Sequence, residues 1–173
     1  MSENHYDLVV IGSGPAGQKG AIAAAKLDKK VAIVDRKEMI GGVSLNTGTI
    51  PSKTLREAIL YFSGFRQRSF YGRDYTLKEK ISVADLAFRV QMVLARELAV
   101  VRSQLQRNGV TTIYGTAKFV DPHTIAIDTV DGPLVLQADY ILIACGTRPA
   151  RSPDIPFDGK WILDSDQLHL VQE

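Results

Sequence analysis

Cysteine is almost absent from this sequence, because Cys145 is the only one among 173 residues. A single thiol cannot form a disulfide within the chain, so dithiol chemistry inside it is excluded. Such sparse cysteine also fits a reducing compartment. The N-terminus shows no basic stretch followed by an apolar segment and a cleavage site, and no apolar run is long enough to span a bilayer. We therefore expect a cytoplasmic protein without a membrane partner.

An excess of one charge and a metal-ligand pattern are missing as well. The 21 lysines and arginines nearly balance the 19 aspartates and glutamates, which gives a formal net charge of +2. So small a charge, without runs of like charge, argues against nucleic acid as a partner. The three histidines, His5, His123 and His169, are scattered without ligand spacing, so we expect no metal site.

The start of the chain has the apolar pattern of a βαβ unit. Leu8–Ile11 is a continuous apolar run that predicts a buried parallel strand. Helical spacing predicts a helix over Pro15–Lys30, and Val31–Val34 predicts a second strand that ends at Asp35. Two parallel strands joined through a helix within about thirty residues are typical of a Rossmann-like α/β fold.

A glycine-rich loop, Gly12–Gly17 with the sequence GSGPAG, lies between the first predicted strand and the helix. Its spacing is that of a dinucleotide-binding loop. In such a loop Gly12 permits the tight turn, Gly14 lets a pyrophosphate approach the backbone, and Gly17 lets helix and strand pack closely. The helix N-terminus then offers unpaired N–H groups and the positive end of its dipole to the phosphates.

Asp35 completes this pattern, because it lies 18 residues after Gly17 at the end of the second predicted strand. A carboxylate there can accept hydrogen bonds from both hydroxyls of a ribose. The competing interpretation is a glycine turn with an unrelated surface acid, but strand, turn, helix, strand and acid in register favour nucleotide binding. The pattern alone does not separate NAD from FAD, so an NAD-binding Rossmann module stays open at this point.

The middle of the chain predicts two helices followed by short strands. Pro51–Arg66 predicts the first helix and Ser69–Lys80 a loop. Ser82 and Asp85 have the spacing of a capping box, which opens a long helix that packs within the domain and stops before Gly109. Strands are then expected at Val110–Tyr114, Lys118–Val120, Thr124–Ile127, Leu134–Leu136 and Tyr140–Cys145, with a hairpin turn at Asp131-Gly132. The predicted fold class is α/β, with a parallel sheet, helices and an inserted antiparallel β meander.

The segment Gly41–Lys53, with the sequence GGVSLNTGTIPSK, resembles the active-site segment of the pyridine nucleotide-disulfide oxidoreductases. This family includes lipoamide dehydrogenase and glutathione reductase. In its redox-active members two cysteines, five positions apart, face the flavin, and here Ser44 and Thr49 occupy those positions. Because a hydroxyl lacks the two-electron chemistry of sulfur, disulfide reductase activity is not expected. The resemblance favours FAD as the nucleotide held by the glycine loop.

The resemblance extends along the whole chain and implies an FAD site. Gly115–Asp121 is similar to the family's loop near the adenine, and Ile143–Pro149 to its Ala-Thr-Gly segment, with Cys145 where threonine is usual. Cys145 is also expected to be a small core residue after a strand. The predicted FAD contacts are Gly12, Gly14, Pro15, Ala16, Gly17, Asp35, Arg36, Gly42, Val43, Ser44, Gly48, Lys53, Gly115, Ala117, Ala144, Cys145 and Gly146.

Lys53 is the one catalytic residue that the resemblance implies. It matches the family's buried lysine beside the reactive nitrogen of the flavin, where a cation would stabilise negative charge on the reduced ring and tune its potential. The competing interpretation is an ordinary lysine at a helix start, with its charge in water.

Within the family, Thr49–Arg56 is most similar to soluble, FAD-containing pyridine nucleotide transhydrogenases, which implies hydride transfer between NADPH and NAD. No second G-x-G-x-x-G occurs. We therefore expect residues 1–150 to be the first part of an FAD-binding domain, and 151–173 a connector toward an NAD(P)-binding domain absent from this N-terminal fragment. The resemblance implies a homodimeric or higher-order parent. The alternatives are another flavin-dependent NAD(P)H oxidoreductase, such as an oxidase or diaphorase, and a non-catalytic FAD-binding fragment.

Overall fold

The computed structural model describes residues 4–36 and 39–167. The chain divides into two compact units. We call Met1–Asn46 with Leu98–Thr147 the sheet unit, and Thr47–Glu97 with Arg148–Glu173 the helical unit. The predicted boundary after residue 150 between a cofactor domain and a connector stays a prediction.

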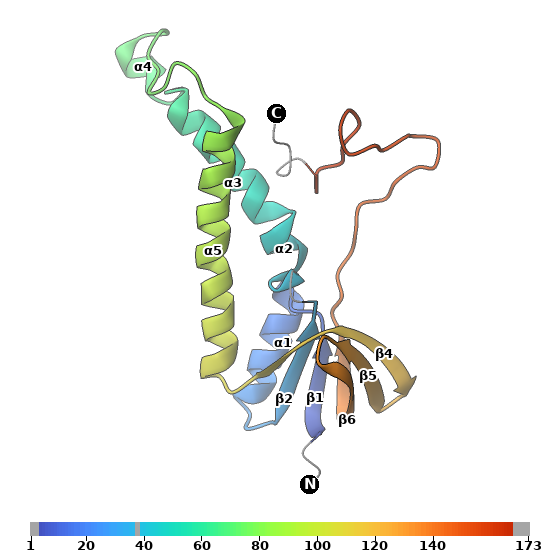
Figure 1. Ribbon diagram of the computed structural model, residues 1–173. Coiled ribbons are helices and arrows are strands. Elements are labelled where there is room, and N and C mark those ends of the chain that lie inside the picture. Colours follow the sequence, from blue (N-terminus) through green and yellow to red (C-terminus); the bar gives the residue numbers. More distant parts are fainter. Residues whose placement is uncertain (1–3, 37–38, 168–173) are drawn as a thin grey trace. The chain divides into compact units, whose positions relative to one another are not determined.

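The sheet unit is built on six strands in the order β3-β2-β1-β6-β5-β4 (Figure 1). Their bounds are β1 His5–Ile11, β2 Val31–Asp35, β3 Thr111–Tyr114, β4 Thr116–Asp121, β5 Thr124–Thr129 and β6 Gly132–Ile143. The neighbours β3, β2, β1 and β6 pair in parallel, whereas β4, β5 and β6 pair antiparallel. This mixed sheet with helices is Rossmann-like and confirms the predicted α/β fold class with its antiparallel meander.

The predicted βαβ unit is present as β1, helix α1 at Pro15–Ala25 and β2. The helix ends five residues earlier than its apolar spacing predicted. After Ala25 the chain turns through Asp28, whose φ of 59° lies in the left-handed region that aspartate tolerates. The Lys29 amide then donates to the Ala24 carbonyl at 3.3 Å, which closes the turn and leads directly into β2.

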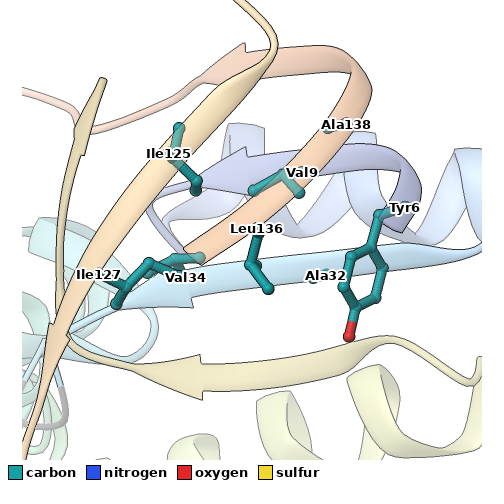
Figure 2. Close-up of a cluster of buried hydrophobic side chains, with 8 residues drawn as sticks. All are labelled: Tyr6, Val9, Ala32, Val34, Ile125, Ile127, Leu136 and Ala138. Carbon is teal, nitrogen blue, oxygen red and sulfur yellow. The ribbon is translucent and has the colours of Figure 1, made fainter. Parts of the chain in front are cut away.

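Both faces of the parallel strands β1 and β2 are buried, which explains their continuous apolar runs. On one face Val9 of β1 packs with residues from β2, β5 and β6, as Figure 2 shows. On the other face Val10 and Ile33 pack against Ala21 of α1 and Leu105. The alternation of Val9 and Val10 between the two clusters is the two-residue period of a strand. Strands β1 and β2 are therefore packed from both sides.

Strand β6 corrects one prediction, because Leu134–Leu136 and Tyr140–Cys145 are not separate strands. A single strand runs over Gly132–Ile143. Its first half pairs antiparallel with β5 across a turn at Val130-Asp131, one residue before the predicted Asp131-Gly132, and its second half pairs in parallel with β1. The polar residues Gln137 and Asp139 interrupt the apolar run. The sequence pattern therefore predicts two strands, although the strand is continuous.

Four more helices follow α1 among the described residues. Their bounds are α2 Gly42–Asn46, α3 Thr49–Phe62, α4 Arg68–Tyr71 and α5 Val83–Arg107. The predicted capping box opens α5, since the Asp85 amide donates to Ser82 Oγ at 3.2 Å and the Ser82 amide to Asp85 Oδ2 at 2.9 Å. The short helix α4 covers the start of the predicted loop Ser69–Lys80, so the loop prediction is wrong for residues 69–71. Helix α2 was not predicted. No helix among the described residues is long and apolar enough to cross a membrane.

Candidate functional site

A groove of about 620 Å³ lies in the sheet unit, where the parallel strands end. The ends are level because Ile11 of β1 is in register with Val34 of β2 and Ile143 of β6. The loops that follow these strands therefore meet at one edge of the sheet, the usual ligand site of open α/β sheets. We call this the strand-end groove, lined by Ile11, Gly12, Gly14, Pro15, Ala16, Val34, Asp35, Arg36, Met39, Gly42, Val43, Ser44, Gly115, Thr116, Ala117, Ala144, Cys145, Gly146 and Thr147.

The three glycines of the GSGPAG loop differ in what surrounds them. Gly12 has a φ of 103°, and a Cβ there would overlap the Ala144 carbonyl. A Cβ on Gly17 would overlap the Gly12 carbonyl oxygen and lie 3.2 Å from Val10 Cγ1. These two glycines are required by the protein's own packing, which confirms their predicted roles in the turn and in the helix–strand contact.

Gly14 is different, because a Cβ there would meet only Gly42 Cα at an ordinary 3.8 Å. Its φ of −64° and ψ of 179° are open to any residue, so the fold itself does not demand glycine at this position. Gly14 is the N-cap of α1, and no side chain caps this helix. The amides of the first turn have no acceptor within a helix. A groove-facing backbone with these donors fits the phosphates of a dinucleotide.

The carboxylate of Asp35 is held at the end of β2 by three donors. Its Oδ2 accepts from the amide and the hydroxyl of Ser13, both at 2.7 Å. Its Oδ1 accepts from the amide of Arg36 at 2.8 Å. Asp35 also anchors the next strand connection, since its carbonyl accepts from the Gly115 amide at 3.0 Å. The predicted ribose acceptor therefore already organises the glycine loop in the protein alone.

The turn that leads into α2 forms the wall of the groove next to the glycine loop. The Gly41 amide donates to Ser13 Oγ at 3.0 Å, and Ser44 Oγ donates to the Gly41 carbonyl at 3.2 Å. Asn46 Nδ2 donates to the Gly42 carbonyl at 2.9 Å, which fixes the turn from its other side. A Cβ on Gly42 would lie 2.6 Å from Gly14 Cα. The two walls of the groove meet at the backbone of Gly14.

The predicted cofactor contacts come together in this groove with three exceptions. Gly17 lies behind the loop, in the contact between helix and strand. Gly48 and Lys53 belong to the helical unit, and the Lys53 side chain is exposed. Their place at a flavin site stays a prediction.

The expectation that Cys145 is a core residue is wrong, because its side chain is exposed. Cys145 follows β6, where the chain leaves the sheet. Its side chain is therefore exposed, although cysteine is usually a buried residue type.

Sequence reasoning missed several residues of the site. Met39, Thr116 and Thr147 line the groove. Thr116 and Thr147 are direct neighbours of predicted contacts and could have been included, whereas no pattern marks Met39. Ser13 was not predicted as a site residue, although it lies between Gly12 and Gly14 of the loop. Among the described residues no group of histidine, cysteine, aspartate or glutamate side chains could hold a metal, and His169 lies outside them.

Comparisons with known proteins agree with this geometry. The family model described as pyridine nucleotide-disulphide oxidoreductase matches residues 6–172. A curated soluble pyridine nucleotide transhydrogenase of Mycobacterium bovis (strain BCG / Pasteur 1173P2) is 56% identical over 165 residues, which is 94% of this chain and 35% of the relative. This chain thus spans about a third of the length of the curated relative.

Two solved structures have the same fold over nearly the whole chain. The crystal structure of LpdA from Mycobacterium tuberculosis superposes with a TM-score of 0.82 at 29% identity, covering 96% of this chain and 37% of that one. The HOCl-induced flavoprotein disulfide reductase RclA from Escherichia coli superposes with a TM-score of 0.76 at 25% identity, covering 97% and 34%.

Proposed function

The chain belongs to the pyridine nucleotide-disulphide oxidoreductase family, and from this premise we propose that the strand-end groove binds the ADP half of FAD. The observation that carries the proposal is Gly14. Its glycine is not required by the fold, and a side chain there would project where a pyrophosphate would approach the backbone. The volume of about 620 Å³ falls within the range of about 300–1,000 Å³ for small-molecule sites.

In this proposal each wall of the groove has a separate task. The N-terminus of α1 offers amide donors and the positive end of its dipole to the phosphates. Asp35 accepts from the ribose, and the adenine is bordered by Gly115, which connects β3 to β4, and by Ala117 of β4. The start of α2, at Gly42–Ser44, supplies a further wall of the groove. The same proposal gives Lys53 the task of stabilising negative charge on the flavin ring.

We further propose that the chain works in an FAD-dependent oxidoreductase that transfers hydride between NADPH and NAD. The name of the Mycobacterium bovis relative supports this reaction. Bound FAD would supply the two-electron chemistry that links the two nicotinamides. Ser44 and Thr49 stand at the dithiol positions, so the proposal includes no disulfide relay. NADPH and NAD would bind to residues outside these 173, in an assembly of two or more copies.

A chimera tests the reaction directly. Residues 1–173 joined to the remaining C-terminal part of the Mycobacterium bovis relative should reduce thio-NAD with NADPH, because hydride transfer needs the nicotinamide held at about 3–3.5 Å from the flavin. The 173-residue chain alone should bind FAD but show no turnover. The matched control is the chimera with Gly14→Val, which should lose both FAD and activity.

The outcomes separate the alternatives. A chimera that holds FAD and oxidises NADPH with oxygen or a dye, but not with thio-NAD, would replace the transhydrogenase with another flavin-dependent NAD(P)H oxidoreductase. A chimera that holds FAD and transfers no electrons would leave a non-catalytic FAD-binding chain. Turnover by the 173-residue chain alone would contradict the need for further residues to hold the nicotinamide.

A further inference from the structure

Ser13 is the one buried polar residue among those that the structure describes, with a relative exposure of 0%. Its position in the glycine loop puts it next to the strand-end groove, but it does not line the groove. A residue without exposed surface cannot contact a ligand directly. Any effect that Ser13 has on binding must therefore pass through its neighbours.

The hydroxyl of Ser13 joins three segments that are far apart in the sequence. It donates to Asp35 Oδ2 at 2.7 Å and accepts from the Gly41 amide at 3.0 Å. The Ser13 amide donates to the same Oδ2, also at 2.7 Å. We call this arrangement the Ser13 clip. It ties the glycine loop both to the end of β2 and to the turn that leads into α2.

The clip makes the two oxygens of Asp35 unequal. A carboxylate oxygen has two lone-pair sites, and both sites of Oδ2 are occupied by donors from Ser13. Among the residues that the structure describes, Oδ1 accepts only from the Arg36 amide, at 2.8 Å, so one of its sites is open to a further donor. Asp35 can therefore offer one oxygen, at a fixed orientation, to a hydroxyl in the groove.

We propose that Ser13 is a positioning residue that holds Asp35 so that its Oδ1 accepts from a ribose hydroxyl of the bound nucleotide. The inference rests on the proposed FAD site and adds to it how the ribose acceptor is oriented. It narrows the expectation that the carboxylate accepts from both ribose hydroxyls, because only Oδ1 is left to accept from the ribose. Ser13 acts on the ligand only through Asp35. The proposal can therefore be tested by measuring whether the effects of substituting Ser13 and Asp35 on binding depend on each other.

A double-mutant cycle on the 173-residue chain measures this coupling, with FAD affinity from flavin fluorescence. Ser13→Ala should weaken binding about tenfold, because a hydrogen bond to a charged group is lost and the carboxylate can rotate. In the Asp35→Ala background the same change should weaken binding by less than about threefold, because the group that Ser13 orients is gone. Equal losses in both backgrounds would overturn the proposal.

A second readout separates positioning from general disturbance of the loop. Ser13→Ala should weaken the binding of ADP about tenfold but leave the binding of 2′,3′-dideoxy-ADP nearly unchanged, because only ADP carries the hydroxyls that Asp35 accepts from. Equal weakening of both ligands would show that Ser13 is merely structural and would overturn the proposal.

Ser44→Ala is the matched control, since its hydroxyl donates to the Gly41 carbonyl in the same turn rather than to Asp35. Its effect on FAD binding should be the same with and without Asp35→Ala. Absence of saturable FAD binding by the unmodified chain would overturn the proposed function and this assignment together. Binding with additive losses from Ser13→Ala and Asp35→Ala would overturn the assignment alone.

Discussion

The sheet unit and the helical unit differ sharply in how many of their hydrophobic side chains are buried. Of the buried hydrophobic residues in the part of the chain that the structure describes, only Ala58 and Val90 belong to the helical unit. Large side chains of the helical unit such as Phe70 and Trp161 are 84% and 82% exposed. The strand-end groove lies wholly in the sheet unit, where β1 and β2 are packed on both faces of the sheet. Recognition of the nucleotide is therefore testable in this chain, whereas the proposed role of Lys53 is testable only in a longer chain such as the chimera.

The largest expected effect is a loss of stability of the sheet unit. Gly17→Ala places a Cβ against the Gly12 carbonyl and Val10, and both belong to rigidly packed backbone and core. We expect it to destabilise the sheet unit by about 3 kcal/mol or more. Thermal unfolding followed by circular dichroism measures the change.

Gly14→Ala in the same loop is the matched control for stability. Its Cβ meets only Gly42 at 3.8 Å, so the stability should change by less than about 1 kcal/mol. Equal destabilisation by Gly14→Ala and Gly17→Ala would show that the packing distinction between the two glycines is wrong.

Cys145 provides a smaller, local test of the groove in the unmutated chain. It is the only cysteine, it is exposed and it lines the groove. Saturating FAD should slow its alkylation by iodoacetamide about tenfold, because a ligand that fills such a site covers most of its lining. Mass spectrometry of the labelled chain gives the rate.

Riboflavin, which lacks the pyrophosphate and adenosine, is the control ligand and should protect Cys145 little. An alkylation rate that FAD does not change would place the bound flavin outside the strand-end groove. In the chimera, alkylation of Cys145 before FAD is added should slow flavin loading rather than abolish electron transfer in the loaded protein.

The smallest expected effect is confined to the helical unit. The Lys78 ammonium, 2.6 Å from Asp85 Oδ2, together with the donors of Ser82, lowers the pKa of Asp85 from 3.8 to about 2. A lowered pKa in the folded chain means that this stabilisation is present above about pH 4 and is lost as the pH falls toward 2. The first turn of α5 should loosen over that window.

Amide chemical shifts of Ser82 and Asp85 report this change. Asp85→Asn should abolish the transition between pH 4 and 2, whereas Asp74→Asn, which alters an exposed acid of the same unit, should leave it in place. A transition that persists in Asp85→Asn would mean that another group controls the helix start.

The sequence predicted those parts of the fold that local packing determines. Gly17 is required by contacts with Gly12 and Val10, which are a few residues away in the βαβ unit, so the glycine spacing revealed the loop. Gly12 has the positive φ of the turn, but its close contact with the Ala144 carbonyl is not local and was not predicted. Gly132 marks a turn whose geometry is local. The continuity of β6 was missed because Gln137 and Asp139 break the apolar pattern, whereas the strand is held by β1 on one side and by β5 on the other.

The parts of the site that were missed depend on contacts between distant residues. The partners of Ser13 are 22 and 28 positions away, at Asp35 and Gly41, and no periodicity relates such positions. Cys145 was expected to be buried from its residue type, but its exposure follows from the path of the loop beyond the sheet edge. Sequence patterns identify the elements that form the groove, and only the folded chain shows how its walls are joined.

An FAD titration of the 173-residue chain with and without Gly14→Val decides whether the strand-end groove is the nucleotide site. We expect saturable binding by the unmodified chain and at least about a 100-fold loss in Gly14→Val, since the side chain blocks several charge-assisted hydrogen bonds to the pyrophosphate. The circular dichroism spectra of the two chains should coincide, because Gly14 has backbone angles open to any residue. Unchanged FAD affinity in a folded Gly14→Val chain would contradict the assignment of the strand-end groove as the nucleotide site.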